Sequence, residues 1–423
     1  MEIMKSLGKL MTAVLLTLTL CSCSSDNNDE APNQAPEAFD LIAIGDGAIE
    51  VEVDSPTFSW NPAIDPEGGP ISYQLILGTN INPTNFIVNN NSNTTHTFPY
   101  RLRYMEQWFW KVIATDNAGK STTSETFSFK TRNLKFPSTA VNPNPMFSPR
   151  FGHRSVVFNN KMWVIAGYDG VLKNDVWNSS DGITWTQLTA SAGFTPRFRP
   201  TSVVFNNKIW IIGGNVNEDG TNANDVWSSP DGITWTQVTA AAPFSSRQDH
   251  TSVVFDDKIW VIGGNEGGTA FRNDVWSSSD GLSWTPVANA PEFTARRGHT
   301  SIVFDNKMWV IAGNDSGLRN DVWSSSNGVD WISVAEPGQF NSSWYHTSVV
   351  FDYKMWVIGG SGNNDAFGST DGTEWTPVST APNTPTWRRH SHTSLVFDDK
   401  VWVIGGFDNN IPGGLTNNVS VLE

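Results

Sequence analysis

The sequence predicts an all-β protein in which a β-sandwich is followed by a six-bladed β-propeller. A fourteen-residue phrase, cleanest at residues 251–264, occurs six times with a period of 46 to 50 residues, which is typical of propellers and solenoids. Each repeat is rich in Trp and β-branched residues. Residues 35–132 instead contain short apolar runs separated by turn residues, which favours a separate sandwich.

The phrase itself predicts two strands joined by a tight turn. Residues 252–255 and 258–262 are apolar and β-branched, and Asp256-Asp257 between them suits a two-residue hairpin. A third strand is expected at Asn-Asp-Val-Trp, which occurs at 174–177, 224–227, 273–276 and 320–323. A fourth is expected after a Ser-Asp-Gly turn or a close variant, from Trp185, Trp235, Trp284, Trp331 and Trp375.

Four such strands form a sheet that cannot bury two apolar faces alone. Radial stacking of the sheets buries both faces and leaves only short edges. Because one Trp side chain can bury about 150–250 Å², we expect most of the 20 Trp residues to form the core between blades.

The last repeat is one strand short. It ends with a single run at residues 418–422, while residues 138–142 precede Phe147 by the spacing at which residues 235–239 precede Phe244. We therefore expect 138–142 to complete the sixth blade and close the ring. This gives a linker at 133–137 and a propeller at 138–423.

The repeats resemble the kelch family through Arg-x-x-His before strand one, Gly-Gly after strand two and Trp opening strand four. Strand two carries Trp where many kelch repeats carry Tyr. The resemblance implies a kelch-type propeller, a fold shared by galactose oxidase. The copper site of that enzyme needs a cysteine cross-linked to a tyrosine, and both cysteines here, Cys21 and Cys23, precede the propeller. Galactose oxidase activity is thus excluded, and no cofactor is expected.

The N-terminus predicts export. Residues 1–22 combine Lys5 and Lys9 with an apolar run too short for a comfortable membrane span. The run ends in Leu-Cys-Ser-Cys, which resembles a bacterial lipobox with Cys23 as the lipidated residue; the alternative is an ordinary secretory signal. Residues 23–34 are acidic and resemble the tether of surface lipoproteins, or form a plain spacer. We expect lipid anchoring in a bacterial outer membrane with exposure at the cell surface.

The sandwich predicted at 35–132 has candidate strands at 56–60, 71–77, 108–114 and 126–129. The spacing of Leu102 and Trp108, followed by Val-x-Ala-x-Asp-x-x-Gly at 112–119, resembles fibronectin type III. Trp108 stands where that family usually has Tyr. The resemblance implies a spacer that holds the propeller away from the membrane.

Composition and repetition exclude some functions. A net charge of −15 argues against nucleic-acid binding, which depends on basic patches. Five histidines recur before strand one, but a ring holds equivalent residues apart, so we expect hydrogen bonds between blades and no metal site. These are His153, His250, His299, His346 and His392.

Two sets of residues are candidates for ligand binding. The first recurs before strand one and would form either a positive collar for carboxylates or structural contacts: Arg150, Arg197, Arg247, Arg296 and Arg389. The second breaks the repeat and suits sugar or peptide recognition, or is surface packing: Arg199, Asp249, Arg297, Trp344, Tyr345 and Trp387.

Three functions remain open. The first is a membrane-anchored binding protein that recognises a glycan or protein at the propeller mouth. The second is an enzyme acting on an anionic sugar, as some kelch-type propellers are sialic-acid mutarotases, with Glu218, Asp219 or Asp249 as acid or base. The third is a structural component of a cell-surface complex. The loop at 215–220 lacks the alternating carboxylates of a calcium loop.

Overall fold

The computed structural model describes residues 32–136, 139–287, 291–335, 340–341, 343–361, 366–378 and 389–422. The predicted leader and Cys23 lie outside these residues. The chain divides into two compact units: one extends to Ala48 and includes Pro56–Pro99 and Trp108–Phe129, and the other comprises Ile49–Ser55, Tyr100–Gln107 and Lys130–Glu423. The domain boundaries proposed from the sequence remain predictions. In the part of the chain described, no helix is long and apolar enough to cross a membrane.

The N-terminal strands form two sheets, ordered β1-β3-β6 and β2-β9-β7-β4-β5, with β8 paired to β7. Phe58 of β3 contacts Trp110 of β7 at 5.1 Å and Phe129 of β9 at 5.9 Å between ring centroids, so the core lies between the sheets. This confirms a sandwich, and its assignment to fibronectin type III remains a prediction. The strands are β1 (Leu41–Ala43), β2 (Ala48–Val51), β3 (Thr57–Trp60), β4 (Ser72–Gly78), β5 (Phe86–Asn91), β6 (Thr95–Thr97), β7 (Gln107–Thr115), β8 (Ser121–Thr123) and β9 (Phe127–Thr131).

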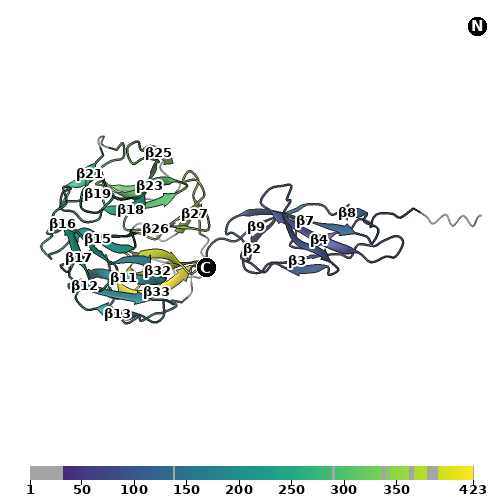
Figure 1. The fold of residues 1–423 in the computed structure, drawn as a ribbon, viewed down its shortest axis with the longest axis horizontal. Coiled ribbons are helices and arrows are strands. Elements are labelled where there is room, and N and C mark those ends of the chain that lie inside the picture. Colours follow the sequence, from purple (N-terminus) through teal and green to yellow (C-terminus); the bar gives the residue numbers. More distant parts are fainter. Residues whose placement is uncertain are drawn as a thin grey trace, which may run out of the picture. The chain divides into compact units, whose positions relative to one another are not determined.

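Six four-stranded sheets form the six predicted blades of a ring (Figure 1). In the sixth sheet the fourth strand is β30, which pairs with β32, and not the predicted closing strand. In order, their strands are β10 (Arg154–Phe158), β11 (Lys161–Tyr168), β12 (Leu172–Ser179) and β13 (Thr186–Thr189); β14 (Thr201–Phe205), β15 (Lys208–Asn215), β16 (Asn222–Ser229) and β17 (Thr236–Thr239); β18 (Thr251–Phe255), β19 (Lys258–Asn265), β20 (Phe271–Ser278) and β21 (Thr285–Pro286); β22 (Thr300–Phe304), β23 (Lys307–Asn314), β24 (Leu318–Ser325) and β25 (Ile332–Ala335); β26 (Thr347–Phe351), β27 (Lys354–Ile358), β28 (Ala366–Ser369) and β29 (Thr376–Pro377); and β30 (Arg389–His390), β31 (Thr393–Phe397), β32 (Lys400–Asp408) and β33 (Leu415–Leu422).

Local chemistry explains the inner hairpin of each blade. In blade three, Phe255 pairs with Lys258, and the two turn residues Asp256 and Asp257 have φ of 49° and 52°. Turns of this hand match the twist of the flanking strands and tolerate Asp and Asn. The Asp-Asp and Asn-Asn pairs in the repeat therefore specify the hairpin register.

The core between blades is built by the tryptophan of strand two. Trp163 is buried with Ile165 of blade one against Ile209 and Ile211 of blade two. Its ring lies on the turn of blade two at Gly232, where an added Cβ would lie 2.1 Å from Trp163 Cζ3. The glycine of the Ser-Asp-Gly turn thus makes room for the tryptophan of the neighbouring blade.

The ring closes where its two ends meet. The Asn142 amide donates to the Val419 carbonyl at 3.1 Å, and the Val419 amide returns the bond at 2.9 Å. Asn417 donates from Nδ2 to the carbonyls of Pro145 and Phe147. The closing segment therefore lies beside β33 as expected, but among residues 139–142 the pairing is one isolated bridge instead of the predicted strand.

Candidate ligand site at the propeller mouth

The repeated arginines are buried within their blades. The Arg247 guanidinium donates to both carboxylate oxygens of Asp274, at 2.6 and 2.8 Å, and to the Gly263 carbonyl at 2.9 Å. Burial alone would raise the pKa of the Asp274 carboxyl, but the hydrogen bond and charge of Arg247 outweigh it, so that pKa is lowered. The same pairing joins Arg150 to Asp175, Arg197 to Asp225 and Arg296 to Asp321.

The expectation of a positive collar is therefore wrong for these four residues. The aspartate of Asn-Asp-Val-Trp on the third strand takes up each guanidinium, which leaves it 0 or 1% exposed. Arg389 is also buried, and its Nη2 lies 3.7 Å from Asp408, since Asn418 replaces the aspartate of its own blade. The five repeated arginines are therefore structural.

The repeated histidines link neighbouring blades, as predicted. His299 Nε2 lies 3.1 Å from the Thr251 hydroxyl, which lies 2.6 Å from the Ser301 hydroxyl. Burial lowers the pKa of His299 to about 3 and that of His346 to about 4, so both are neutral. Equivalent contacts join His153 to Thr393, His250 to Thr201, His346 to Thr300 and His392 to Thr347.

Lowering the pH is expected to decrease the free energy of unfolding of the propeller, because these buried histidines resist protonation. The unfolded chain takes up their protons below about pH 6.5, whereas buried His299 and His346 stay neutral down to about pH 3 and 4. Their stabilisation is thus fully present above pH 6.5 and is lost as the pH falls toward those values, by up to about 1.4 kcal/mol per pH unit for each histidine. Urea unfolding of wild type and His299→Gln between pH 7 and 4 should show a shallower pH dependence in the variant; equal slopes would contradict this linkage.

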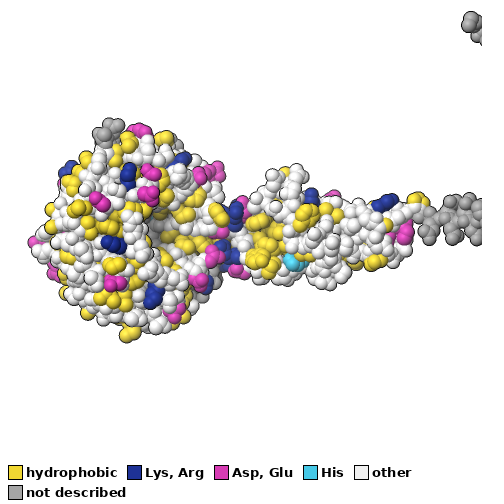
Figure 2. All heavy atoms as spheres, in the orientation of Figure 1, with side chains coloured by type: hydrophobic (Ala, Val, Ile, Leu, Met, Phe, Trp, Pro, Cys, Tyr) yellow, Lys and Arg dark blue, Asp and Glu magenta, His cyan; other side chains and the backbone are white. Residues whose placement is uncertain are grey.

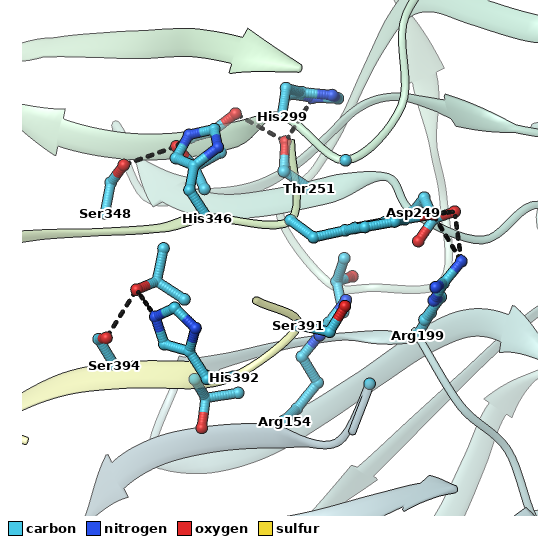
Figure 3. Close-up of a pocket in the computed structure, with 18 of the residues that line it drawn as sticks. Arg154, Arg199, Asp249, Thr251, His299, His346, Ser348, Ser391, His392 and Ser394 are labelled. Atoms are coloured by element: carbon cyan, nitrogen blue, oxygen red, sulfur yellow. Dashed lines mark hydrogen bonds and ion pairs between the residues drawn. The ribbon is translucent and has the colours of Figure 1, made fainter. Parts of the chain in front are cut away.

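One blade junction departs from this pattern. Between blades one and two, Pro200 replaces the histidine and Arg154 replaces the threonine. Arg154 donates from Nε to the Pro200 carbonyl and from Nη1 to the His153 carbonyl. Burial lowers its pKa to about 10, against the opposing effect of the Asp249 carboxylate. Arg154 lines a central cavity of about 200 Å³ (Figure 3), and it is not among the site residues predicted from the sequence.

The residue before each histidine position forms an inner ring. All six have left-handed backbones with φ between 53° and 62°. Backbone hydrogen bonds pass from blade to blade, for example from the Arg199 amide to the Gly152 carbonyl at 2.7 Å and from the Tyr345 amide to the Gly298 carbonyl at 2.9 Å. One repeat position therefore brings six residues of five types to the cavity: Gly152, Arg199, Asp249, Gly298, Tyr345 and Ser391.

Three of these side chains form a hydrogen-bonded network. Arg199 Nη1 lies 2.6 Å from the Tyr345 hydroxyl and 3.2 Å from Asp249 Oδ2, and the hydroxyl donates to Asp249 Oδ2 at 3.0 Å. Burial and the Asp249 charge raise the pKa of Tyr345 well above its ordinary value. Figure 3 shows Arg199 and Asp249 facing each other. With Arg154 alongside, the site carries two cations and one anion among these residues.

Aromatic groups extend the site outward. Trp344 stacks on Tyr345 with centroids 4.3 Å apart, and the Arg297 guanidinium lies 4.9 Å from the Trp344 ring. The repeat-breaking candidates Arg199, Asp249, Arg297, Trp344 and Tyr345 are therefore brought together. The view in Figure 2 shows the ring hollowed near its centre, with polar and hydrophobic side chains around the hollow.

The two remaining acidic candidates have different surroundings. Glu218 lines a second cavity, whereas Asp219 accepts hydrogen bonds from the Thr221 hydroxyl and amide within its own turn, which lowers its pKa. Trp387 lies outside the described residues. Within those residues, no group of three or more His, Cys, Asp or Glu side chains is placed to hold a metal ion.

The fold is a propeller with an asymmetric set of side chains around its axial cavity. The family model described as "KLHDC2/KLHL20/DRC7 Kelch-repeats domain" matches residues 112–291 and 184–360, more than half of the chain. The chain therefore belongs to the kelch-repeat family. A solved structure titled "Structure of YjhT" matches at 18% identity and a TM-score of 0.55, covering 67% of this chain and 97% of that one; at this identity the likeness concerns the fold. No curated protein sequence matches.

Proposed function

We propose that this protein is a membrane-anchored, extracytoplasmic binding protein whose propeller mouth recognises a glycan or protein ligand. The network of Arg199, Asp249 and Tyr345 at the axial cavity is the observation that carries the proposal. The kelch-type fold supports a binding or sugar-modifying role in general. Anchoring rests on the lipobox-like segment ending at Cys23, and surface exposure rests on the acidic tether at residues 23–34.

The network departs from the rest of the repeat at a cost in stability. Left-handed backbone is unfavourable for residues with a Cβ, by roughly 1–2 kcal/mol, and blades one and four use Gly152 and Gly298 at this position. The pair Arg154 and Pro200 likewise gives up a histidine–threonine link that the other junctions keep. Local departures of this kind are expected at functional sites.

A second candidate function is an enzyme acting on an anionic sugar. The Tyr345 hydroxyl keeps its proton because its pKa is raised by burial, and it lies 3.0 Å from Asp249 Oδ2. A proton donor beside a carboxylate suits acid–base chemistry, and Arg154 and Arg199 would hold the carboxylate of the substrate.

Arg199→Gly is expected to abolish or strongly weaken ligand binding without loss of folding. Glycine occupies the equivalent position in two blades, so the left-handed backbone suits the substitution. Loss of the ion pair to buried Asp249 should lower the melting temperature, while the other blades keep the fold. A hydrogen bond to a charged group contributes about 1.5–3 kcal/mol, so affinity should fall at least about tenfold. Binding of the leaderless protein to a glycan array, and to proteins captured from the cell envelope, measures this.

A second variant tests the same site by restoring the repeat. Arg154→Thr combined with Pro200→His should rebuild the histidine–threonine link and keep the fold while weakening binding. The matched control is Arg319→Ala, since Arg319 lies on β24 paired with Asp315 and is outside the mouth residues. Unchanged binding in both mouth variants would refute the proposal, and turnover of an acidic sugar that is lost with Tyr345→Phe would favour the enzyme.

A further inference from the structure

We propose that a second cavity beside the axial one is a subsite for a neutral sugar ring, so that the ligand is a glycan of at least two units. The inference rests on the proposed function and specifies its ligand class. The cavity has a volume of about 220 Å³ and is lined by residues of blades one, two and three. Its lining includes Phe151, Tyr168, Phe198, Asn215, Glu218 and Gln248.

Three aromatic rings form one wall of this cavity. The ring centroids of Phe151 and Tyr168 are 5.7 Å apart, and each lies 5.9 Å from that of Phe198. All three side chains are half-buried. The C–H faces of a pyranose are apolar and pack against aromatic faces, and an aromatic wall with a few placed polar groups is typical of small-ligand sites.

The polar lining offers hydrogen-bond acceptors. Asn222 donates from Nδ2 to the carbonyls of Asn265 and Glu266, so its Oδ1 accepts from Asn215 Nδ2. That orientation leaves Asn215 Oδ1 without a hydrogen-bond partner in the described structure, on a side chain that is 2% exposed.

The other two polar residues complete the acceptor set. Gln248 Oε1 also has no partner among the described residues, and Glu218 adds a carboxylate at the rim. Because buried acceptors without partners are costly, this lining selects a ligand that donates several hydrogen bonds, as sugar hydroxyls do.

Charge around the cavity favours a neutral ligand. The Arg199 guanidinium lies 5.1 Å from the Phe198 ring and 5.8 Å from the Phe151 ring. The Glu218 carboxylate in the same lining carries the opposite charge, so a charged ligand would be attracted by one group and repelled by the other. A polyhydroxylated ring without charge needs neither group as a counter-ion and can donate to the acceptors of the lining.

Arg199 also connects this cavity to the axial site. The guanidinium that lies over Phe198 donates to Tyr345 and Asp249. A ligand seated on the aromatic wall therefore reaches the axial network through its next unit, which requires at least a disaccharide.

The test uses neutral gluco-, galacto- and manno-oligosaccharides of one to four units, titrated into the leaderless protein. The repeat supplies variants expected to fold: Tyr168→Asn, because Asn265 and Asn314 hold that position elsewhere, and Phe198→Gln, because blade three has Gln248. Each should weaken binding of at least one neutral oligosaccharide tenfold or more, and monosaccharides should bind at least tenfold more weakly than longer chains. Tyr353→Asn, in the exposed turn after β26, should change nothing.

The outcomes separate this inference from the proposed function. Binding of neutral oligosaccharides that is insensitive to Tyr168→Asn and Phe198→Gln overturns the subsite. So does a ligand that is only a protein or an acidic glycan, lost with Arg199→Gly alone; the proposed function then stands. Binding unaffected by any of these variants overturns both. Each variant must retain a single cooperative unfolding transition above the temperature of the binding assay.

Discussion

Asp175→Ala is expected to lower the free energy of unfolding of the propeller by about 3–5 kcal/mol. The carboxylate holds Arg150 through two bonds of 2.6 and 2.8 Å and accepts a third from Trp177 Nε1 at 2.8 Å. Arg150 is 1% exposed, so the substitution leaves a buried guanidinium without its counter-charge. Urea unfolding followed by tryptophan fluorescence measures the loss.

Two further variants identify the cause of that loss. Asp181→Ala removes an exposed carboxylate that accepts the amides of Ile183 and Thr184 in a turn of the same blade, and should cost about 1 kcal/mol. Arg150→Met combined with Asp175→Leu removes both charges and should recover much of the stability. Blade five already uses Ser343 in place of the arginine. A wild-type midpoint for Asp175→Ala would show that the buried pair contributes little.

The fold could be predicted because the same local contacts recur. Neighbouring blades contact each other mostly through the same positions, so a phrase that occurs six times specifies closely similar interfaces; five of the six junctions keep the histidine–threonine link. Trp163 against Gly232 and His299 against Thr251 show this. The closing segment was predicted from the spacing before Phe147, although its pairing is a single bridge at Asn142.

The candidate site could be predicted only in part. Arg199, Asp249 and Tyr345 break the repeat, which predicts a role in binding, and the structure brings them together. The expectation of a positive collar of arginines was wrong, because their partner aspartates lie about 25 residues further along the sequence on the third strand. Blade five lacks the arginine and blade six lacks the aspartate. Because the two residues are not lost in the same blade, the sequence does not indicate that they pair.

Other residues of the site could be identified only from the three-dimensional structure. Arg154 and Pro200 are each visible as a departure from the repeat, but only the ring geometry shows that they replace the two partners of one link. In the aromatic wall, Phe151 and Phe198 lie in the loops before β10 and β14, and Tyr168 lies at the end of β11. No local pattern in the sequence indicates that the three rings meet.

Phe147→Ala should destabilise the propeller by about 3–5 kcal/mol, the usual cost of removing a buried phenylalanine side chain. Phe147 is 1% exposed, and its ring lies 5.1 Å from that of Trp185. Phe244 is the equivalent residue before blade three, away from the ring closure. It has the same exposure and lies 5.2 Å from Trp284, so Phe244→Ala is the matched control. If the two ends close the ring in solution, the two variants should lose similar stability in urea unfolding. A much smaller loss for Phe147→Ala would mean that the segment before blade one frays, and that the sixth blade is held by β30 to β33 alone.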